Sequence, residues 1–419
     1  MPMPIQIFEH GTLVVGEPGF NATHFGALVR YNDRHDCVFF KVGHQRIHFS
    51  SFVGVIQVGN LAIEILPKAE KGALADKGKW QRALLQMLRQ VGWLDVEAAP
   101  EADLYLRHSS LIDLYLDAFL EEVERLTHVG LVKKYRTTEA NLYKLKGRIL
   151  FRQQVSRNLL HRERIYTAHE IYDRDNLFNR ILKCAVGIVE RLAVRQALAA
   201  RASVLKLTFE QLSECRITAE TFEQVVWGRN TERYRRAIQL ARLIILNYSP
   251  DLRGGHEHVV AILFDMNKLF ERFILVQISR ARSAFANRRL RVQGQASKRF
   301  WASKSIRPDI VADFDHGETS ERVILDTKWK VPKDGLPADD DLKQMYAYNL
   351  HFGGRRSVLV YPRADAEQNG NRQPYAPSMG LPPDHTHECA TYYIDLFDDH
   401  QQLRRDIGAK LIEHVILDA

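Results

Sequence analysis

The first 67 residues alternate short apolar stretches with breaks that contain glycine. Stretches rich in β-branched and aromatic residues occur at 5–8, 37–42, 46–49, 53–58 and 61–66. Short runs of this composition, bounded by glycine and asparagine, are typical of β-strands joined by tight turns. The pattern therefore predicts a small β-barrel or β-sandwich at the start of the chain.

Apolar residues recur at helical spacing through the middle of the chain. This periodicity predicts helices at 80–91, 111–126, 176–201 and 231–247. Between the second and third of these, Lys146-Gly147-Arg148 lies among apolar residues and predicts a basic hairpin over 133–155. Such a hairpin suits an acidic partner or a phosphate backbone, but basic hairpins are more often simply solvated charged surface. The PDLRGG segment at 250–255 ends the helical run and predicts a boundary.

The pattern becomes mixed after this boundary. It predicts strands at 290–296, 298–302, 309–314, 322–330, 357–361 and 391–396, and helices at 259–279, 339–351 and 401–417. Such a mixed order is typical of an α/β domain. We therefore predict a mixed α+β chain in three parts: a β-rich N-terminal domain over 1–165, a helical connector over 166–255 and an α/β domain over 256–419.

Composition narrows the classes of partner and of site. Hydrophobic residues make up 45% of the 419 residues and charged residues 26%, which suffices for several globular cores. The net charge of +8 favours an anionic partner such as nucleic acid. The four cysteines form no CxxC pair, so we expect a cytoplasmic location and neither a zinc site nor a disulfide framework. The hydropathy pattern predicts no signal peptide and no membrane span.

Two adjacent predicted strands carry the residues with the clearest chemistry. They are RPDIVADF at 307–314 and VILDTKWK at 323–330, joined by a polar turn. Because side chains alternate between the two faces of a strand, Asp326 and Lys328 share one face. A hairpin centred in the polar segment would place Asp309 opposite Lys328. Two carboxylates and one ammonium then converge on one patch of the sheet.

This patch suits the hydrolysis of phosphodiester bonds. Asp309 and Asp326 offer the oxygen ligands that Mg²⁺ prefers, with Mn²⁺ as an alternative ion. A metal ion stabilises charge on the scissile phosphate, and Lys328 can stabilise the charge that develops during attack by water. The alternative for Asp326 and Lys328 is a salt pair on an exposed edge strand. Asp313 is a rival metal ligand, since it shares a face with Asp309.

Further polar residues flank the patch. Glu271, on the preceding predicted helix, either completes the metal site or is a solvated helix residue. Gln344 and Tyr348 lie one turn apart on the following helix, where they bind a DNA phosphate or Lys328, or pack against the core. Basic residues crowd the segment before Asp309, with two aromatic residues among them: Arg288, Arg289, Arg291, Lys298, Arg299, Phe300, Trp301 and Lys304. This segment is either a grip on the DNA backbone or a basic surface flank.

A known family matches these pieces in their order along the chain. PD followed by D-x-K on the next strand resembles the PD-(D/E)xK nuclease superfamily. RPDIV, ILDTKWK and QMYAY, together with the earlier IEILPK, LKGRI and DNLFNRILK, are similar to the McrC family, the nuclease subunit of McrBC modification-dependent restriction systems. The resemblance extends from Ile63 to Tyr348.

The resemblance implies a fold, a reaction and a partner. Residues 256–419 would form a restriction-endonuclease-like domain that cleaves DNA with Mg²⁺. Its metal ligands would be Asp309 and Asp326, its catalytic lysine Lys328, and its accessory residues Glu271 and Gln344. Residues 1–165 would dock on a hexameric AAA+ GTPase similar to McrB and stimulate its GTP hydrolysis. That partner, and not this chain, would bind GTP and recognise double-stranded DNA carrying modified cytosine. The chain contains no GxxxxGK[ST] sequence, in agreement with this division of labour.

Two other functions fit the same residues. One is a stand-alone PD-(D/E)xK nuclease in DNA repair, which would cut without a GTPase. The other is a non-catalytic activator of the GTPase with a vestigial nuclease site. The presence of Asp309, Asp326 and Lys328 argues against the activator.

Overall fold

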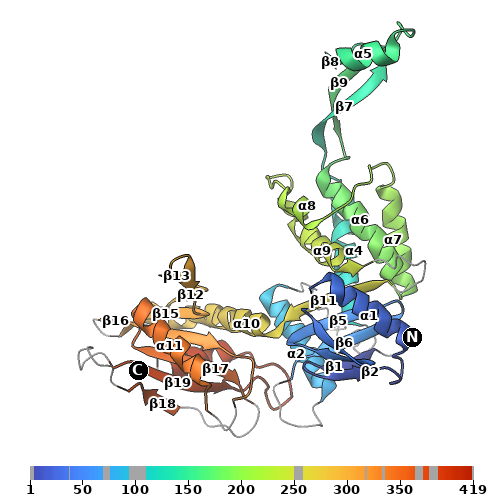
Figure 1. The fold of residues 1–419 in the computed structure, drawn as a ribbon. Helices are drawn as coiled ribbons and strands as arrows, with labels where there is room; N and C mark the ends of the chain where they lie inside the picture. Colours follow the sequence, from blue (N-terminus) through green and yellow to red (C-terminus); the bar gives the residue numbers. More distant parts are fainter. Residues whose placement is uncertain are drawn as a thin grey trace. The chain divides into compact units, whose positions relative to one another are not determined.

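The computed structural model is a mixed α/β protein that divides into two compact units (Figure 1). It describes residues 4–36, 38–68, 76–93, 110–249, 258–316, 319–332, 336–363, 371–376 and 386–417. The first unit comprises Met1–Val55, Ile63–Ala98 and Leu263–Ala419, and the second comprises Ile56–Ala62 and Ala99–Ile262. Each unit combines segments that are far apart in the chain, so the units do not coincide with the three consecutive domains expected from the sequence. The three-domain division stays a prediction.

The N-terminal segment of the first unit mixes strands with helices. Its elements are β1 (Ile5–Phe8), β2 (Thr12–Val14), α1 (Ala22–Arg34), β3 (Phe40–Gly43), β4 (Arg46–Phe49), β5 (Phe52–Val58), β6 (Leu61–Leu66) and α2 (Lys77–Val91). The prediction of an all-β barrel or sandwich was wrong because it missed α1. The Asn21 side chain caps this helix by accepting a hydrogen bond from the backbone N of His24. Leu28 and Tyr31 then bury one face, at helical spacing.

These strands form two sheets. One is three-stranded in the order β2-β4-β3, and the other is five-stranded in the order β1-β6-β5-β11-β10. In the second sheet, β1 runs parallel to β6, with Ile5 paired to Ile63. The strands β10 (Tyr248–Ser249) and β11 (Val259–Asp265) join it from much later in the chain. Residues 259–265 were wrongly predicted to begin a helix. A continuous apolar run has no periodicity that separates a buried strand from a buried helix.

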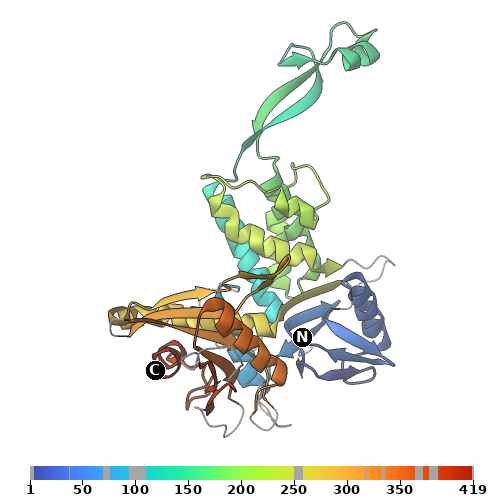
Figure 2. The same cartoon turned by 60° about the vertical axis from the view of Figure 1, so that its left-hand side comes forward.

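The second unit is a group of helices that carries a long two-stranded arm. The helices are α4 (Leu111–Val129), α6 (Leu177–Leu192), α7 (Gln196–Thr208), α8 (Ala219–Glu223), η1 (Glu232–Tyr234) and α9 (Arg235–Leu246). The single helix predicted over 176–201 is therefore two helices, since the backbone leaves the helical region at Ala193. Figures 1 and 2 show the arm extending away from these helices.

The arm replaces the short hairpin predicted over 133–155. Its strand β7 (Lys134–Leu142) pairs with β9 (Ile165–Asp173), from Lys134–Asp173 to Leu142–Ile165. A short strand β8 (Arg148–Ile149) and helix α5 (Phe151–Asn158) lie between them, at the far end of the arm (Figure 2). The return strand was missed because these inserted elements separate it from the basic segment.

The C-terminal part of the first unit is a six-stranded sheet with helices. The strands follow the order β12-β15-β16-β17-β19-β18. Their bounds are β12 (Arg291–Gly294), β15 (Ile310–His316), β16 (Thr319–Thr327), β17 (Arg356–Pro362), β18 (Asn371–Pro374) and β19 (Glu388–Ile394). β17 runs parallel to both β16 and β19, while the other pairs are antiparallel. A separate two-stranded hairpin is formed by β13 (Lys298–Trp301) and β14 (Lys304–Ile306).

Helices α10 (Met266–Ala281) and α11 (Asp339–Phe352) pack on this sheet. Met345, Tyr348 and Phe352 of α11 are buried with Ile324 and Leu359 of the central strands in one core cluster. The 3₁₀ helix η2 (Arg282–Arg288) continues α10, and the chain closes with α12 (Ile407–Leu411) and a π-helical turn (Ile412–Ile416). The last helix is shorter than the predicted 401–417. No helix in the described ranges is long and apolar enough to cross a membrane.

Candidate active site

The β15–β16 hairpin places the two predicted metal ligands side by side. Its register pairs Ile310 with Leu325, so one further step along the ladder sets Asp309 opposite Asp326. The sequence had suggested Lys328 as the residue opposite Asp309, which was wrong by two positions. The ladder closes at the pair of residues 316 and 319, earlier than the assumed turn.

The middle residue of the DTK sequence holds Asp309 in place. Oδ2 of Asp309 accepts hydrogen bonds from the backbone N of Thr327 at 2.7 Å and from its Oγ1 at 2.8 Å. Thr327 is buried, so both bonds form away from bulk water. Sequence reasoning gave Thr327 no role, because x in D-x-K points to the opposite face of an ideal strand. It reaches Asp309 at the point where β16 ends.

Lys328 lies beside Asp326 and is positioned from α11. Its Nζ is 2.6 Å from Oδ2 of Asp326 and donates to Oε1 of Gln344 at 3.0 Å. Nε2 of Gln344 donates to the Tyr348 hydroxyl at 2.6 Å, and that hydroxyl donates to the carbonyl of Arg307 at 3.1 Å. Gln344 and Tyr348 thus link the lysine to the residue two before Asp309. Tyr348 is buried, which favours this positioning role over the predicted contact with DNA.

Burial and mutual repulsion perturb the acids of the site. Burial, and then the charge of Asp309, raises the pKa of Asp326 to about 7. Burial also raises the pKa of Asp309, although the hydrogen bonds from Thr327 and the charge of Lys328 oppose it. Burial alone would lower the pKa of Lys328, but neighbouring carboxylates, Asp326 first, give a net rise. One ammonium therefore faces the buried carboxylate of Asp326 and the half-buried carboxylate of Asp309, and a divalent cation would relieve that imbalance.

The donor set fits Mg²⁺. This ion commonly binds one or two carboxylates and completes its shell with water and substrate phosphate. Oδ2 of Asp326 is buried, and within the described ranges its contact is the Lys328 ammonium, without the geometry of a directed hydrogen bond. No cluster of three or more His, Cys, Asp or Glu residues in the described part of the chain could hold a metal ion. Asp309 and Asp326 are the two carboxylates that the strand register pairs, and a third ligand from Glu271 stays a prediction.

Glu271 approaches the same region from α10. Its Oε1 accepts a hydrogen bond from Nε2 of Gln295. The backbone N of Gln295 in turn donates to the carbonyl of Asp309 at 2.9 Å. Burial, and then the charge of Asp309, raises the pKa of Glu271. The charge of Asp309 therefore acts on Glu271, and Gln295 links the Glu271 carboxylate to the main chain at Asp309.

The structure also shows where the other sequence candidates lie. Asp313, the rival ligand, is engaged in an ion pair with Arg322 (Nε–Oδ1 2.6 Å) on the neighbouring strand. Asp341 was missed, yet it is buried at the start of α11 with Oδ1 3.7 Å from Nζ of Lys328. The available signal was the acidic run 339–341, at the start of the helix predicted after DTKWK. Acidic residues are common in the first turn of a helix, so this run did not stand out.

Three of the predicted DNA-binding cations, Lys298, Arg299 and Lys304, lie on the β13–β14 hairpin, while Arg288 and Arg289 precede β12. Arg288 ends η2, Arg289 lies 3.6 Å from Asp315, and Lys304 is exposed on β14. On β13, Nζ of Lys298 donates to the carbonyl of His351 at 3.0 Å, and Nε of Arg299 donates to the carbonyl of Ala302. These cations therefore lie on surface elements that lead into Asp309.

Trp329, next to the catalytic lysine candidate, anchors the strand on the N-terminal segment. Its indole is buried, and Nε1 donates to Oε1 of Glu9 at 2.6 Å. The ring packs edge-on against Trp80 of α2 and Phe270 of α10, with centroids 6.2 and 5.1 Å away. Burial raises the pKa of Glu9 to about 7. Sequence reasoning missed this contact, which joins residues 320 positions apart.

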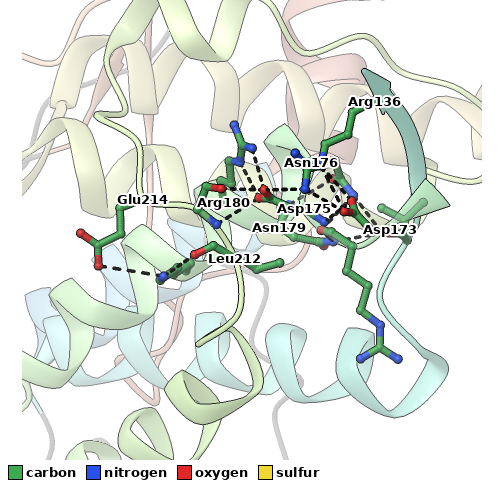
Figure 3. Close-up of polar contacts among 12 residues, drawn as sticks. Arg136, Asp173, Asp175, Asn176, Asn179, Arg180, Leu212 and Glu214 are labelled. Atoms are coloured by element: carbon green, nitrogen blue, oxygen red, sulfur yellow. Dashed lines mark hydrogen bonds and ion pairs between the residues drawn. The ribbon is translucent and has the colours of Figure 1, made fainter. Parts of the chain in front are cut away.

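The DNLFNRILK sequence fastens the base of the arm, as Figure 3 shows. Oδ1 of Asp175 accepts from Nε of Arg180 at 2.7 Å, and Oδ2 accepts from Oγ of Ser213 at 2.7 Å. Arg136 of β7 forms an ion pair with Asp173 of β9 (Nη2–Oδ2 2.9 Å). Arg180, first among the causes, holds the pKa of Asp175 well below its usual range.

Two asparagines of the same sequence complete the anchor. The Nδ2 atoms of Asn176 and Asn179 both donate to the carbonyl of Val132, at 2.9 and 3.0 Å. The buried hydroxyl of Tyr234 accepts from the backbone N of Val132 and donates to Oδ1 of Asn179. Every member of this buried group has a partner, which rigidifies the root of the arm.

Three comparisons with known proteins agree on one family. Residues 47–362 match the family model described as McrBC 5-methylcytosine restriction system component. The chain is 21% identical over 246 residues to the type IV methyl-directed restriction enzyme EcoKMcrBC of Escherichia coli K12, covering 58% of this chain and 69% of that protein. It also matches a chain in a solved half-complex of Thermococcus gammatolerans McrB AAA+ hexamers with bound McrC. That match has a TM-score of 0.68 and 20% identity, with both chains covered in full.

Proposed function

Because this chain belongs to the McrBC 5-methylcytosine restriction system component family, we propose that it is the DNA endonuclease subunit of such a system. It would cleave double-stranded DNA carrying modified cytosine when driven by an AAA+ GTPase similar to McrB. The observation that carries the nuclease assignment is the convergence of Asp309, Asp326 and Lys328 at one end of the β15–β16 hairpin. The PD-(D/E)xK fold of the C-terminal part belongs to this proposal.

The chain's own residues divide the work of hydrolysis. Asp309 and Asp326 would hold Mg²⁺, which would supply positive charge for the scissile phosphate and for activation of the attacking water. Thr327 orients the Asp309 carboxylate through two hydrogen bonds. Gln344 holds the Lys328 ammonium against the same patch, where it stabilises the charge that develops on the phosphate.

The arm is the surface best suited to the GTPase partner. The matched solved assembly contains McrB AAA+ hexamers with bound McrC. In this chain, large apolar side chains are exposed along the arm: Tyr143, Leu145, Phe151, Val155, Leu159 and Leu160. Apolar groups gathered on an exposed surface mark a protein interaction site. The arm would therefore dock on the partner, which binds GTP, and would stimulate GTP hydrolysis.

The test is cleavage of methylated and unmethylated plasmid with Mg²⁺, GTP and the partner. We expect cutting of the methylated plasmid only, and its loss in the Asp326→Ala variant with partner binding retained. Asp313→Ala is the matched control, because it removes a carboxylate from the same hairpin that is engaged with Arg322. Cutting by Asp326→Ala would remove the active-site assignment.

The same reactions separate the other two functions. Cutting by this chain alone, without partner or GTP, would identify an independent nuclease. Stimulation of GTP hydrolysis without any cutting would identify a non-catalytic activator. Both results contradict the proposal, and each one supports a different alternative function.

A further inference from the structure

The β13–β14 hairpin lies directly before the candidate active site in the chain. It forms a two-stranded sheet of its own, and in the chain it follows β12 and precedes β15, two strands that pair with each other in the main sheet. Asp309 follows three residues after the end of β14 at Ile306. The base of the hairpin, where Lys298 pairs with Ile306, therefore leads directly into the proposed catalytic carboxylates, and a duplex is large enough to contact both.

The hairpin presents a tryptophan that the fold does not use. All four residues of β13 are exposed, and Trp301 has 71% of its surface accessible. Its neighbour Phe300 packs edge-on against His351, with centroids 5.1 Å apart, and Lys298 lies over the ring of Phe352. Trp301 has no ring contact with another residue in the described part of the chain. The two anchored side chains fix the hairpin on α11 and leave the indole outside.

The backbone of the hairpin is shaped to present this side chain. The pairing shifts register between Arg299 and Trp301, which is a bulge at Phe300. Bulges re-aim side chains and are frequent beside active sites. Ala302, next to Trp301, has a φ of 47°, a conformation that costs a residue with a Cβ on the order of 1 kcal/mol. An exposed hairpin with a strained turn and an unburied indole has no evident benefit for folding.

The charge of the chain segment that contains the hairpin indicates the kind of partner. From Arg272 to Pro308 the chain contains ten arginine and lysine residues and no aspartate or glutamate. A segment of this charge attracts the DNA backbone. Proteins that insert apolar side chains between base steps unstack and kink the duplex there. An exposed indole within a strongly basic segment has this combination of groups.

We propose that Trp301 is a wedge that inserts between base pairs of the duplex beside the scissile phosphate. The proposal rests on the proposed nuclease function and adds a specific deformation of the substrate. Lys298 and Phe300 hold the hairpin, the basic segment grips the backbone, and the indole replaces one stacking contact between neighbouring base pairs. Insertion bends the duplex and would help bring the phosphate to Asp309 and Asp326.

The experiment uses the full-length chain with Asp326→Asn, which blocks cleavage, together with the partner and GTP. Duplexes carry 2-aminopurine at successive positions, whose emission rises when the base is unstacked. We expect a rise at one or two adjacent positions. The rise should disappear with Trp301→Ala and persist with Trp301→Phe. Because stacking contributes roughly 1–3 kcal/mol per base by alanine substitution, Trp301→Ala should weaken binding by about tenfold.

Two controls make the result specific. Val226→Ala removes an equally exposed apolar side chain, 76% accessible, from the second unit and should change nothing. Circular dichroism of Trp301→Ala should match the parent, since the indole is outside the core. Duplex binding with an unchanged 2-aminopurine signal in Trp301→Ala would overturn the wedge alone. No duplex binding by the Trp301-containing chain would overturn the wedge together with the nuclease assignment.

Discussion

Thr327→Val tests the geometry of the site more sharply than removal of a carboxylate. Thr327 donates two hydrogen bonds to one oxygen of Asp309, from its backbone N and from Oγ1. Valine has nearly the same shape and the same β-branched preference for a strand. The substitution therefore removes the Oγ1 bond and leaves the backbone bond and the packing in place.

The size of the effect follows from the kind of bond lost. A hydrogen bond to a charged group contributes about 1.5–3 kcal/mol, which corresponds to roughly 10- to 100-fold in an equilibrium constant. Burial raises the pKa of Asp309, and the two bonds from Thr327 lower it. Loss of one bond raises that pKa further. More protons then compete with Mg²⁺ at neutral pH, so half-maximal cleavage requires about tenfold more Mg²⁺.

The assay is the rate of plasmid cleavage against Mg²⁺ concentration, with partner and GTP, at pH 6.5, 7.5 and 8.5. The Mg²⁺ requirement of Thr327→Val should move toward that of the parent as pH rises, because fewer protons then compete for Asp309. Thr327→Ser keeps the hydroxyl and should behave like the parent. Thr391→Val makes the same chemical change at a buried hydroxyl of β19 that has no hydrogen-bond partner in the described part of the chain.

Either of two results would refute the proposed role of Thr327. If Thr327→Val needs the same Mg²⁺ as the parent at every pH, then Thr327 does not orient a metal ligand. A loss of cleavage that neither Mg²⁺ nor alkaline pH restores would also count against it. In that case the threonine would support the sheet and not the carboxylate.

Three further results are expected. At limiting Mg²⁺, cleavage by the parent should fall as pH drops below about 7, where Asp326 takes up a proton, and higher Mg²⁺ should move the midpoint to lower pH. Burial raises the pKa of Glu9 from 4.5 to about 7, so its charge opposes folding increasingly from pH 4.5 to 7, by about 3 kcal/mol once ionisation is complete. Glu9→Gln should recover part of this free energy, which a higher thermal midpoint at pH 8 would show, with little gain at pH 5. At Gly147, φ is +73° and an added Cβ would lie 2.3 Å from the carbonyl oxygen of Ala168. Gly147→Ala should therefore distort the far part of the arm and reduce the stimulation of GTP hydrolysis. DNA binding by the free chain should stay unchanged.

The sequence was sufficient to group the proposed catalytic residues Asp326 and Lys328 because they are close together in the chain. Asp326 and Lys328 are two positions apart on one strand, and their shared face follows from the geometry of any strand. The contact between Lys328 and Gln344 was also foreseen, since a helix directly after the strand returns over the sheet. Local patterns fixed these choices without knowledge of the rest of the fold.

The features that could not be predicted from the sequence depend on strand register or on contacts between distant segments. The position opposite Asp309 depends on where the turn closes, and an error of one residue in its centre changed the partner by two. The helix α1 was missed because its apolar residues lie in a short segment bounded by glycines, a pattern that also predicts strands. The contact between Glu9 and Trp329 joins residues 320 positions apart, and no local pattern encodes it.

The end of the strand that carries DTKWK contributes both to the proposed site and to the core, and the alternation of its side chains separates the two roles. Asp326 and Lys328 lie at the proposed site, while Trp329 is buried against Glu9, Trp80 and Phe270. Met1–Val55 and Leu263–Ala419 accordingly belong to one compact unit. The N-terminal segment is then part of the scaffold that holds Lys328. A fragment beginning at residue 256 would keep every proposed catalytic residue, yet it would expose the indole that fixes the position of the lysine.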